Sequence, residues 1–158
     1  MRKNIRDKFY ANIGKVIKSH GRCLQGVFGG DGQWSFSYTI GNQIHDLPEL
    51  LLIGSHQGTY LNELSNRMID RGAPFANGEI IETYICEETG KNYRVQIFNA
   101  APEAKSEYTI QAGQFFGTEN YRVQQVVLSD NDGRLPGEIG CDSKVASIPI
   151  LLEPAGTA

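Results

Sequence analysis

The sequence has no long apolar run, which excludes one broad class of protein at once. Its longest uninterrupted aliphatic stretch is Leu50–Ile53, far short of the roughly 20 residues that a membrane helix needs. The segment from Met1 to Lys8 is strongly charged and has no apolar stretch behind it, so it does not predict a secretory signal. We therefore expect a cytoplasmic protein with no membrane partner.

Cysteine is scarce, and the usual catalytic motifs are missing. The three cysteines, at positions 23, 86 and 141, form neither a CxxC pair nor a zinc knuckle, so reduced and mostly buried thiols are expected. No GxSxG, no Cys-His-Asn set and no recognisable carboxylate pair is present. These absences favour a non-catalytic protein and predict no cofactor and no metal ion. Dispersed active-site residues would leave no motif, so an enzyme stays open.

Charge is low overall but unevenly distributed. The net charge is −3, yet residues 1–22 carry seven Lys and Arg against one acid, and the rest carries eight against seventeen. A basic start can attract nucleic acid or anionic lipid. No aromatic residues interleave with these charges in a base-stacking pattern, so nucleic acid is not an expected partner. A helix with a basic, solvated face is the favoured interpretation.

The apolar pattern predicts an α+β fold. Trp34, Phe36, Tyr38 and Ile40 alternate with small hydroxyl residues, as on a half-buried strand, while Leu50–Ile53 is typical of a central strand. The predicted order is a helix within 1–22, strands at 23–28 and 34–41, a strand from 50, a helix at 57–71, strands at 80–86 and 93–98, a helix at 102–117 and a strand at 121–128.

We expect one domain, residues 1–158, built on a largely antiparallel sheet of about six strands with two or three helices. Its parts are the basic amphipathic helix of 1–22, the core sheet with helices of 23–128, and a turn with an irregular C-terminal tail at 129–158. The glycine-rich turn at 26–32 joins two strands and lacks the lysine of a P-loop. Edge strands of such a sheet need covering, which makes a homo-oligomer plausible.

Four sequence pieces in order carry a family resemblance. They are Phe36–Gly41; Pro48–Leu50 with Gly54; Gly72, Phe75 and Gly78; and Gln125–Val127 with Asp130, Gly133, Arg134 and Pro136. Together they resemble the domain of unknown function 4262 family, a set of small bacterial and phage proteins with no agreed activity. The chain departs from that pattern at Asn42, where similar members tend to have Leu, and at Leu47, where many have His.

Two groups of residues are candidates for a binding site. The first comprises His45, Asp46, Glu49 and His56 near the ends of one strand, and could bind a metal ion or supply an acid and a base. Their spacing matches no known ligand signature, so structural or solvated roles are favoured. Glu49 in particular directly precedes a buried strand and is expected to accept backbone N–H groups or to pair with a cation.

The second group is a row of polar side chains on predicted strands. Ser37 and Thr39 alternate with apolar residues on one strand, and Arg94 and Gln96 do so on another. If these side chains and Gln125 shared one covered face, they would suit an anionic or nucleotide-like ligand. A hydrated outer sheet face is the alternative. The turn at Asp130–Gly133 fails the calcium-loop pattern and predicts a tight turn closed by Asx hydrogen bonds.

Three functional hypotheses follow from these observations. The first is a non-catalytic module that binds a small anionic or nucleotide-like ligand through Ser37, Thr39, His45, Glu49, Arg94, Gln96 and Gln125. In a phage or bacterial setting it would sequester a signalling nucleotide. The second is a protein-interaction domain of the inhibitor or immunity type, using acidic residues such as Glu82, Glu87 and Glu88. The third is a hydrolase with His45 as base, oriented by Glu49 or Asp46.

Overall fold

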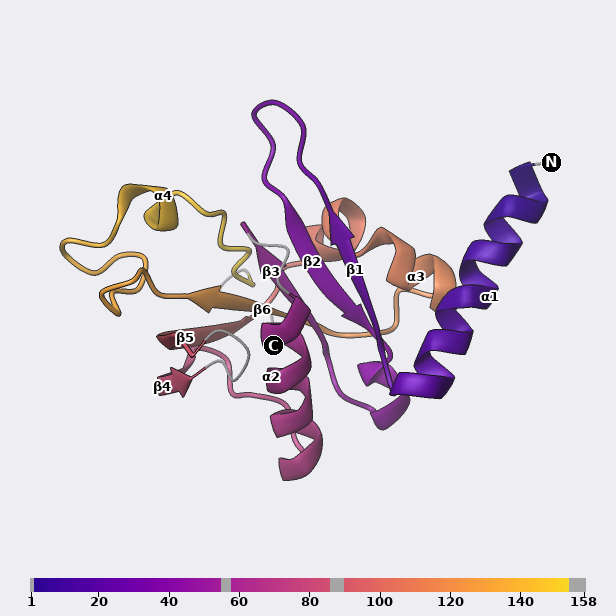
Figure 1. Ribbon diagram of the computed structural model, residues 1–158, viewed down its shortest axis with the longest axis horizontal. Helices are drawn as coiled ribbons and strands as arrows, with labels where there is room; N and C mark the ends of the chain where they lie inside the picture. Colours follow the sequence, from indigo (N-terminus) through magenta and orange to yellow (C-terminus); the bar gives the residue numbers. More distant parts are fainter. Residues whose placement is uncertain (1, 55–57, 86–89, 154–158) are drawn as a thin grey trace.

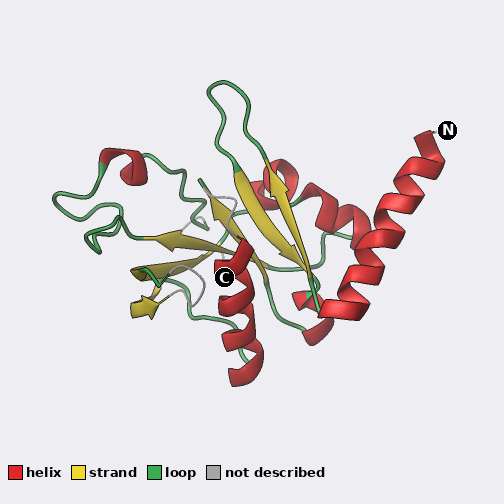
Figure 2. Ribbon diagram, viewed as in Figure 1, coloured by secondary structure: helices red, strands yellow, loops and turns green. Residues whose placement is uncertain are grey.

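The computed structural model describes residues 2–54, 58–85 and 90–153 (Figure 2). Its α-helices are α1 (Arg2–His20), α2 (Gly58–Arg71), α3 (Ile110–Phe116) and α4 (Ser143–Ala146), with short helical turns η1 (Asn42–His45) and η2 (Ala104–Tyr108). Its strands are β1 (Cys23–Val27), β2 (Phe36–Ile40), β3 (Glu49–Ile53), β4 (Glu79–Ile85), β5 (Asn92–Asn99) and β6 (Val123–Leu128). The predicted elements therefore exist with ends shifted by a few residues, except that the single helix predicted at 102–117 is divided into η2 and α3.

One six-stranded sheet has the order β1-β2-β3-β6-β5-β4. Four of its five pairings are antiparallel, but β3 and β6 run parallel. The sheet is thus mixed, and the largely antiparallel prediction was incomplete, because it counted hairpins and missed this one long crossover. The chain leaves β3 through α2 and the β4–β5 hairpin, and returns through η2 and α3 to the end where β3 begins. There the Glu49 N–H donates to the Arg122 carbonyl at 2.9 Å.

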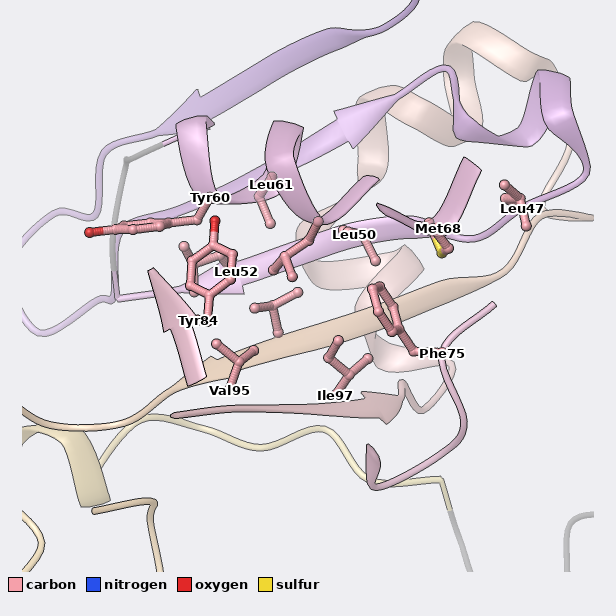
Figure 3. Close-up of a cluster of buried hydrophobic side chains, with 12 residues drawn as sticks. Leu47, Leu50, Leu52, Tyr60, Leu61, Met68, Phe75, Tyr84, Val95 and Ile97 are labelled. Carbon is pink, nitrogen blue, oxygen red and sulfur yellow. The ribbon is translucent and has the colours of Figure 1, made fainter. Parts of the chain in front are cut away.

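Helices lie on both faces of the sheet (Figure 1), and a cluster of buried apolar side chains lies between them and each face. Helix α2 packs on one face, where Leu61, Leu64 and Met68 are fully buried against Leu50 and Val126. Figure 3 shows this cluster between the helix and the strands. The stripe at three- and four-residue spacing is why residues 58–71 form a helix on this face.

Helices α1 and α3 lie on the opposite face. Ile13 and Ile17 of α1 and Ala112 of α3 are buried there together with Tyr38 and Leu51. The part of α1 before Ile13 extends away from the sheet (Figure 1), and its side chains Ile5 and Phe9 are exposed. None of the helices in the described part of the chain is long and apolar enough to cross a bilayer.

Candidate functional site

The predicted polar row does not share one face of the sheet. Ser37 pairs with Leu52 and so lies on the α2 face with Thr39, whereas Gln125 pairs with Leu51 and faces α1 and α3. Gln96 pairs with Val127 and lies on the same face as Gln125, as does Arg94. The single composite face is therefore a wrong expectation. Alternation fixes which residues of one strand share a face, but the register between distant strands decides how those faces combine.

Thr39 and Glu49 meet in a buried polar cluster at the start of β3. The Thr39 hydroxyl donates to Glu49 Oε1 at 2.8 Å, and backbone N–H groups of residues 41, 42 and 43 donate to the two carboxylate oxygens at 2.9–3.1 Å. Gly41 has φ 136°, and a Cβ there would lie 3.0 Å from the Arg22 Cα, so only glycine fits. The expected role of Glu49 as an acceptor of backbone N–H groups is confirmed.

Asn42 and Arg22 extend this cluster toward α2. The Asn42 amide donates to Ser65 Oγ at 2.9 Å and to the Pro48 carbonyl at 3.1 Å, while its Oδ1 accepts from Arg22 Nε at 3.1 Å. The Arg22 guanidinium also donates to the side chains of Asn62 and Asn66. The buried cluster consists of Arg22, Thr39, Asn42, Glu49 and Ser65, while Asn62 is half-buried and Asn66 is exposed at its edge. It fixes the loop that leads to Pro48.

Burial raises the pKa of the Glu49 carboxyl, while hydrogen bonds from Gln43 N–H, the Thr39 hydroxyl and the neighbouring N–H groups lower it. The same burial lowers the pKa of Arg22, and the Glu49 charge raises it. All the surrounding groups of Glu49 donate hydrogen bonds, so the carboxylate is held as a structural acceptor. Its two oxygens are already occupied, which favours a structural role over ligand contact.

The remaining members of the first candidate group do not join Glu49. His45 is exposed in η1 and makes no hydrogen bond to a carboxylate within the described residues. Asp46 is also exposed, adopts φ 57° and lies 3.8 Å from Arg122. His56 lies outside the described residues. No group of three or more His, Cys, Asp or Glu side chains that could bind a metal ion is found in the described ranges.

The other predicted ligand residues make structural contacts. Gln125 is fully buried and clamps the C-terminal segment, donating to the Pro149 carbonyl and accepting from the Leu151 N–H at 2.7 Å each. Gln96 donates to the Gly78 carbonyl at 3.2 Å. Both contacts hold neighbouring backbone in place on the sheet.

Arg94 joins the β4–β5 hairpin to the loop after β6. Its guanidinium pairs with Glu82 at 3.0 Å and with Glu138 at 2.7 Å. The carboxylate of Glu82, which was proposed as part of an acidic interaction patch, is therefore paired with the Arg94 guanidinium. The other two members of that patch, Glu87 and Glu88, lie outside the described residues.

The turn after β6 has the expected Asx geometry. Asp130 Oδ1 accepts from the N–H groups of Asp132 and Arg134, and its Oδ2 accepts from that of Asp142 at 2.9 Å. The N–H groups of Arg134 and Asp142 hold the pKa of the Asp130 carboxyl below its ordinary value. Asp130 thereby anchors the first part of the C-terminal segment.

A cleft of about 670 Å³ lies where β3 and β6 begin; we call it the amino-end cleft. Pro48, Pro74 and Phe75 line it with apolar atoms, Asn99 and Gln124 line it with amides, and Lys105 and Arg122 line it with cations. Its volume falls in the range of small-molecule sites, about 300–1,000 Å³. Glu119 and Glu153, both exposed, also lie at its margin.

Gln124, one of the residues that line the amino-end cleft, has a buried side-chain acceptor without a partner. Its Nε2 donates to the Phe75 carbonyl at 2.7 Å and to Asn99 Oδ1 at 3.0 Å, which fixes the orientation of the amide. Its Oε1 is the one buried side-chain polar atom without a hydrogen-bond partner among the described residues. An unpaired buried acceptor costs about 1–3 kcal/mol, so native proteins seldom retain one without a reason.

Two basic side chains flank the cleft and retain donors for a ligand. Arg122 is half exposed and donates through Nη2 to the Asp46 carbonyl at 2.5 Å, one of the five N–H groups that a guanidinium carries. Lys105 donates to the Glu119 carbonyl at 2.6 Å, and its Nζ lies 5.0 Å from the centre of the Tyr121 ring. Aromatic and backbone contacts thus position the ammonium group at the cleft.

The opposite end of the parallel strands carries a chemically different cavity of about 400 Å³. Asp130, Asp132 and Asp142 contribute to its lining together with the side chains of Tyr60 and Tyr93. Three carboxylates repel an anion. Of the two ends of the β3–β6 pair, the amino end is therefore the one suited to an anionic ligand.

The residues of the amino-end cleft were not identified from the sequence. Gln124 and Gln125 are neighbours in a strand. Only Gln125 was predicted as a ligand residue, because it was expected to share a sheet face with the other polar residues. Lys105 and Arg122 are 17 positions apart in the chain and lie in no motif. The adjacent polar pair in an otherwise apolar strand was the one available signal, since one of two such residues must face each covered side.

A family model described as a domain of unknown function (DUF4262) matches residues 16–142. Neither a curated protein nor a solved structure matches the chain.

Proposed function

The chain belongs to the DUF4262 family, a domain of unknown function, and from that premise we propose that it is a non-catalytic module that binds a small anionic, nucleotide-like ligand in the amino-end cleft. The observation that carries the proposal is the combination of two cations with the unpaired Gln124 acceptor in one cleft of suitable volume.

The charges support an anionic group near the mouth of the cleft. Arg122 directly precedes β6 and Lys105 belongs to η2, and both line the same cavity. Guanidinium and ammonium groups are the usual partners of phosphate oxygens. A phosphate between them would gain charge-assisted hydrogen bonds without displacing the backbone contacts that hold the two side chains.

The apolar and amide residues of the lining support a ring system that carries a donor. Pro48, Pro74 and Phe75 offer apolar contact, and Gln124 offers a carbonyl oxygen. An amino or imino N–H of a nucleobase is a donor of the required kind. A ring that lacks such a donor would leave the buried Gln124 oxygen unpaired and would therefore bind more weakly. Since Oε1 is closed to solvent in this structure, a small shift of the lining accompanies binding.

The first test is thermal stability in the presence of ligands. We expect a nucleotide at about 100 times its Kd to stabilise the protein by about 2.7 kcal/mol, or roughly 5–10 °C for a chain of this size. The panel comprises 5′-mononucleotides, cyclic nucleotides, ADP-ribose and the uncharged nucleosides. Nucleosides should shift the melting temperature less than their phosphates do, because they lack the group that Arg122 and Lys105 bind.

Two variants locate the response. Arg122→Gln should reduce the nucleotide-induced shift, whereas Arg67→Gln, an exposed arginine on α2 that does not line the cleft, should not. Unchanged melting temperatures across the whole panel would refute the proposed function.

A further inference from the structure

A second cavity lies directly beside the amino-end cleft. It has a volume of about 580 Å³ and is lined by Arg6 of α1, by Gln114 and neighbouring residues of α3, and by the segment that follows α3. Lys105, Glu119 and Tyr121 line both cavities. The two cavities therefore lie on the two sides of one wall, which these three residues form. We call the second cavity the helix-side cavity.

The shared wall is held in place by hydrogen bonds of its own. The Tyr121 hydroxyl lies 2.8 Å from the Thr109 hydroxyl and donates to the Thr109 carbonyl at 3.1 Å. The Lys105 ammonium sits over the Tyr121 ring and donates to the Glu119 carbonyl. Because Lys105 lines both cavities, an anion in either cavity can contact its ammonium group.

The helix-side cavity has a cation of its own. Arg6 is exposed and packs over Tyr10, with 5.9 Å from its guanidinium carbon to the ring centre. Tyr10 in turn donates a hydrogen bond to Gln114, which ties α1 to α3 beside the cavity. The basic groups thus follow the order Arg122, Lys105 and Arg6 across the two cavities, with Lys105 in the middle. The acidic residue Glu119 also lines both cavities.

We propose that the ligand is a dinucleotide whose two phosphates are separated by one nucleoside. One nucleotide occupies the amino-end cleft, the linking phosphate lies at Lys105, and the second nucleotide extends into the helix-side cavity beside Arg6. This inference rests on the proposed function, because it assigns the ligand class of the same site. Each cavity is large enough for one nucleotide-sized group.

Calorimetric titration distinguishes this proposal from simple mononucleotide binding. The probes are the four 5′-mononucleotides and the homodinucleotides that carry a 5′-phosphate, titrated into the full chain. We expect at least one dinucleotide to bind about tenfold more tightly than its mononucleotide, which corresponds to one additional charge-assisted contact. Arg6→Gln should weaken dinucleotide binding about tenfold and change mononucleotide binding by less than about twofold.

Lys8→Gln is the matched control, because Lys8 is an exposed cation of the same helix that lines neither cavity; it should change neither affinity. Equal affinities for mononucleotides and dinucleotides would overturn the inference and leave the proposed function standing. An Arg6→Gln effect of equal size on both ligand types would also overturn it. Absence of any binding would refute the inference and the proposed function together.

Discussion

Replacing Glu49 with alanine is expected to lower the free energy of unfolding by about 3–5 kcal/mol, the usual cost of removing one member of a buried charged cluster. The substitution leaves three backbone N–H groups and the Thr39 hydroxyl without their acceptor. It also leaves the buried Arg22 guanidinium without the nearby negative charge that favours its ionised form. Urea denaturation followed by circular dichroism measures the change.

Two further variants test whether the loss of stability comes from the buried hydrogen-bond acceptor rather than from the loss of any negative charge. Glu103→Gln alters an exposed glutamate and should change stability by less than about 0.5 kcal/mol. Glu49→Gln keeps the shape but places an NH₂ group against N–H donors, so it should still destabilise the protein. If Glu49→Ala were as mild as Glu103→Gln, the structural role assigned to this carboxylate would be wrong.

The buried cluster also bears on the amino-end cleft. Asn42 binds the Pro48 carbonyl, and Pro48 lines the cleft. The loop that Glu49 caps carries Asp46, whose carbonyl accepts from Arg122. The cluster therefore positions one wall of the cleft and the backbone carbonyl that Arg122 contacts. A destabilised loop should weaken ligand binding even where the protein remains folded.

Reversing the charge of Lys105 should have the largest effect on binding. Lys105→Glu removes the cation shared by the two cavities and adds a second anion beside Glu119. We expect nucleotide affinity to fall by at least about 100-fold, since loss of an attractive contact and addition of a repulsive one each correspond to about tenfold. Isothermal titration calorimetry at low ionic strength gives the affinity directly.

Lys105→Met is the graded control for this prediction. Methionine keeps an unbranched apolar side chain against Tyr121 but lacks the ammonium charge and its hydrogen bond to the Glu119 carbonyl, so the affinity should fall about tenfold. The affinities of wild type, Lys105→Met and Lys105→Glu should decrease in that order. An unchanged affinity in Lys105→Glu would place the ligand elsewhere on the protein.

Local sequence patterns predicted the elements well because each is set by neighbouring residues. The alternation from Phe36 to Ile40 and the stripe of Leu61, Leu64 and Met68 become β2 and α2. The parallel pairing of β3 with β6 could not be predicted in the same way. It depends on a crossover of about 70 residues between Ile53 and Val123, and no local periodicity encodes where such a segment returns.

The candidate site was harder to predict for a related reason. Ser37 and Gln125 were assigned correctly to strands, but their faces depend on the registers of β2 with β3 and of β3 with β6. Glu49 was predictable as an acceptor because it directly precedes a buried strand. Lys105 and Arg122 line one cleft only because η2 lies beside the segment that precedes β6, where Lys105 contacts Glu119 and Tyr121, and no motif in the sequence marks that contact.

The most direct measurement of the central claim is nuclear magnetic resonance of the ¹⁵N-labelled protein titrated with a nucleotide. We predict that the Gln124 side-chain amide, the Arg122 Nε–H and backbone signals near Lys105 shift together and saturate at one Kd. Signals of Asp130 and Asp142, at the opposite end of the parallel strands, should stay in place. Shifts confined to that acidic end, or spectra that do not change at all, would contradict an anion-binding site in the amino-end cleft.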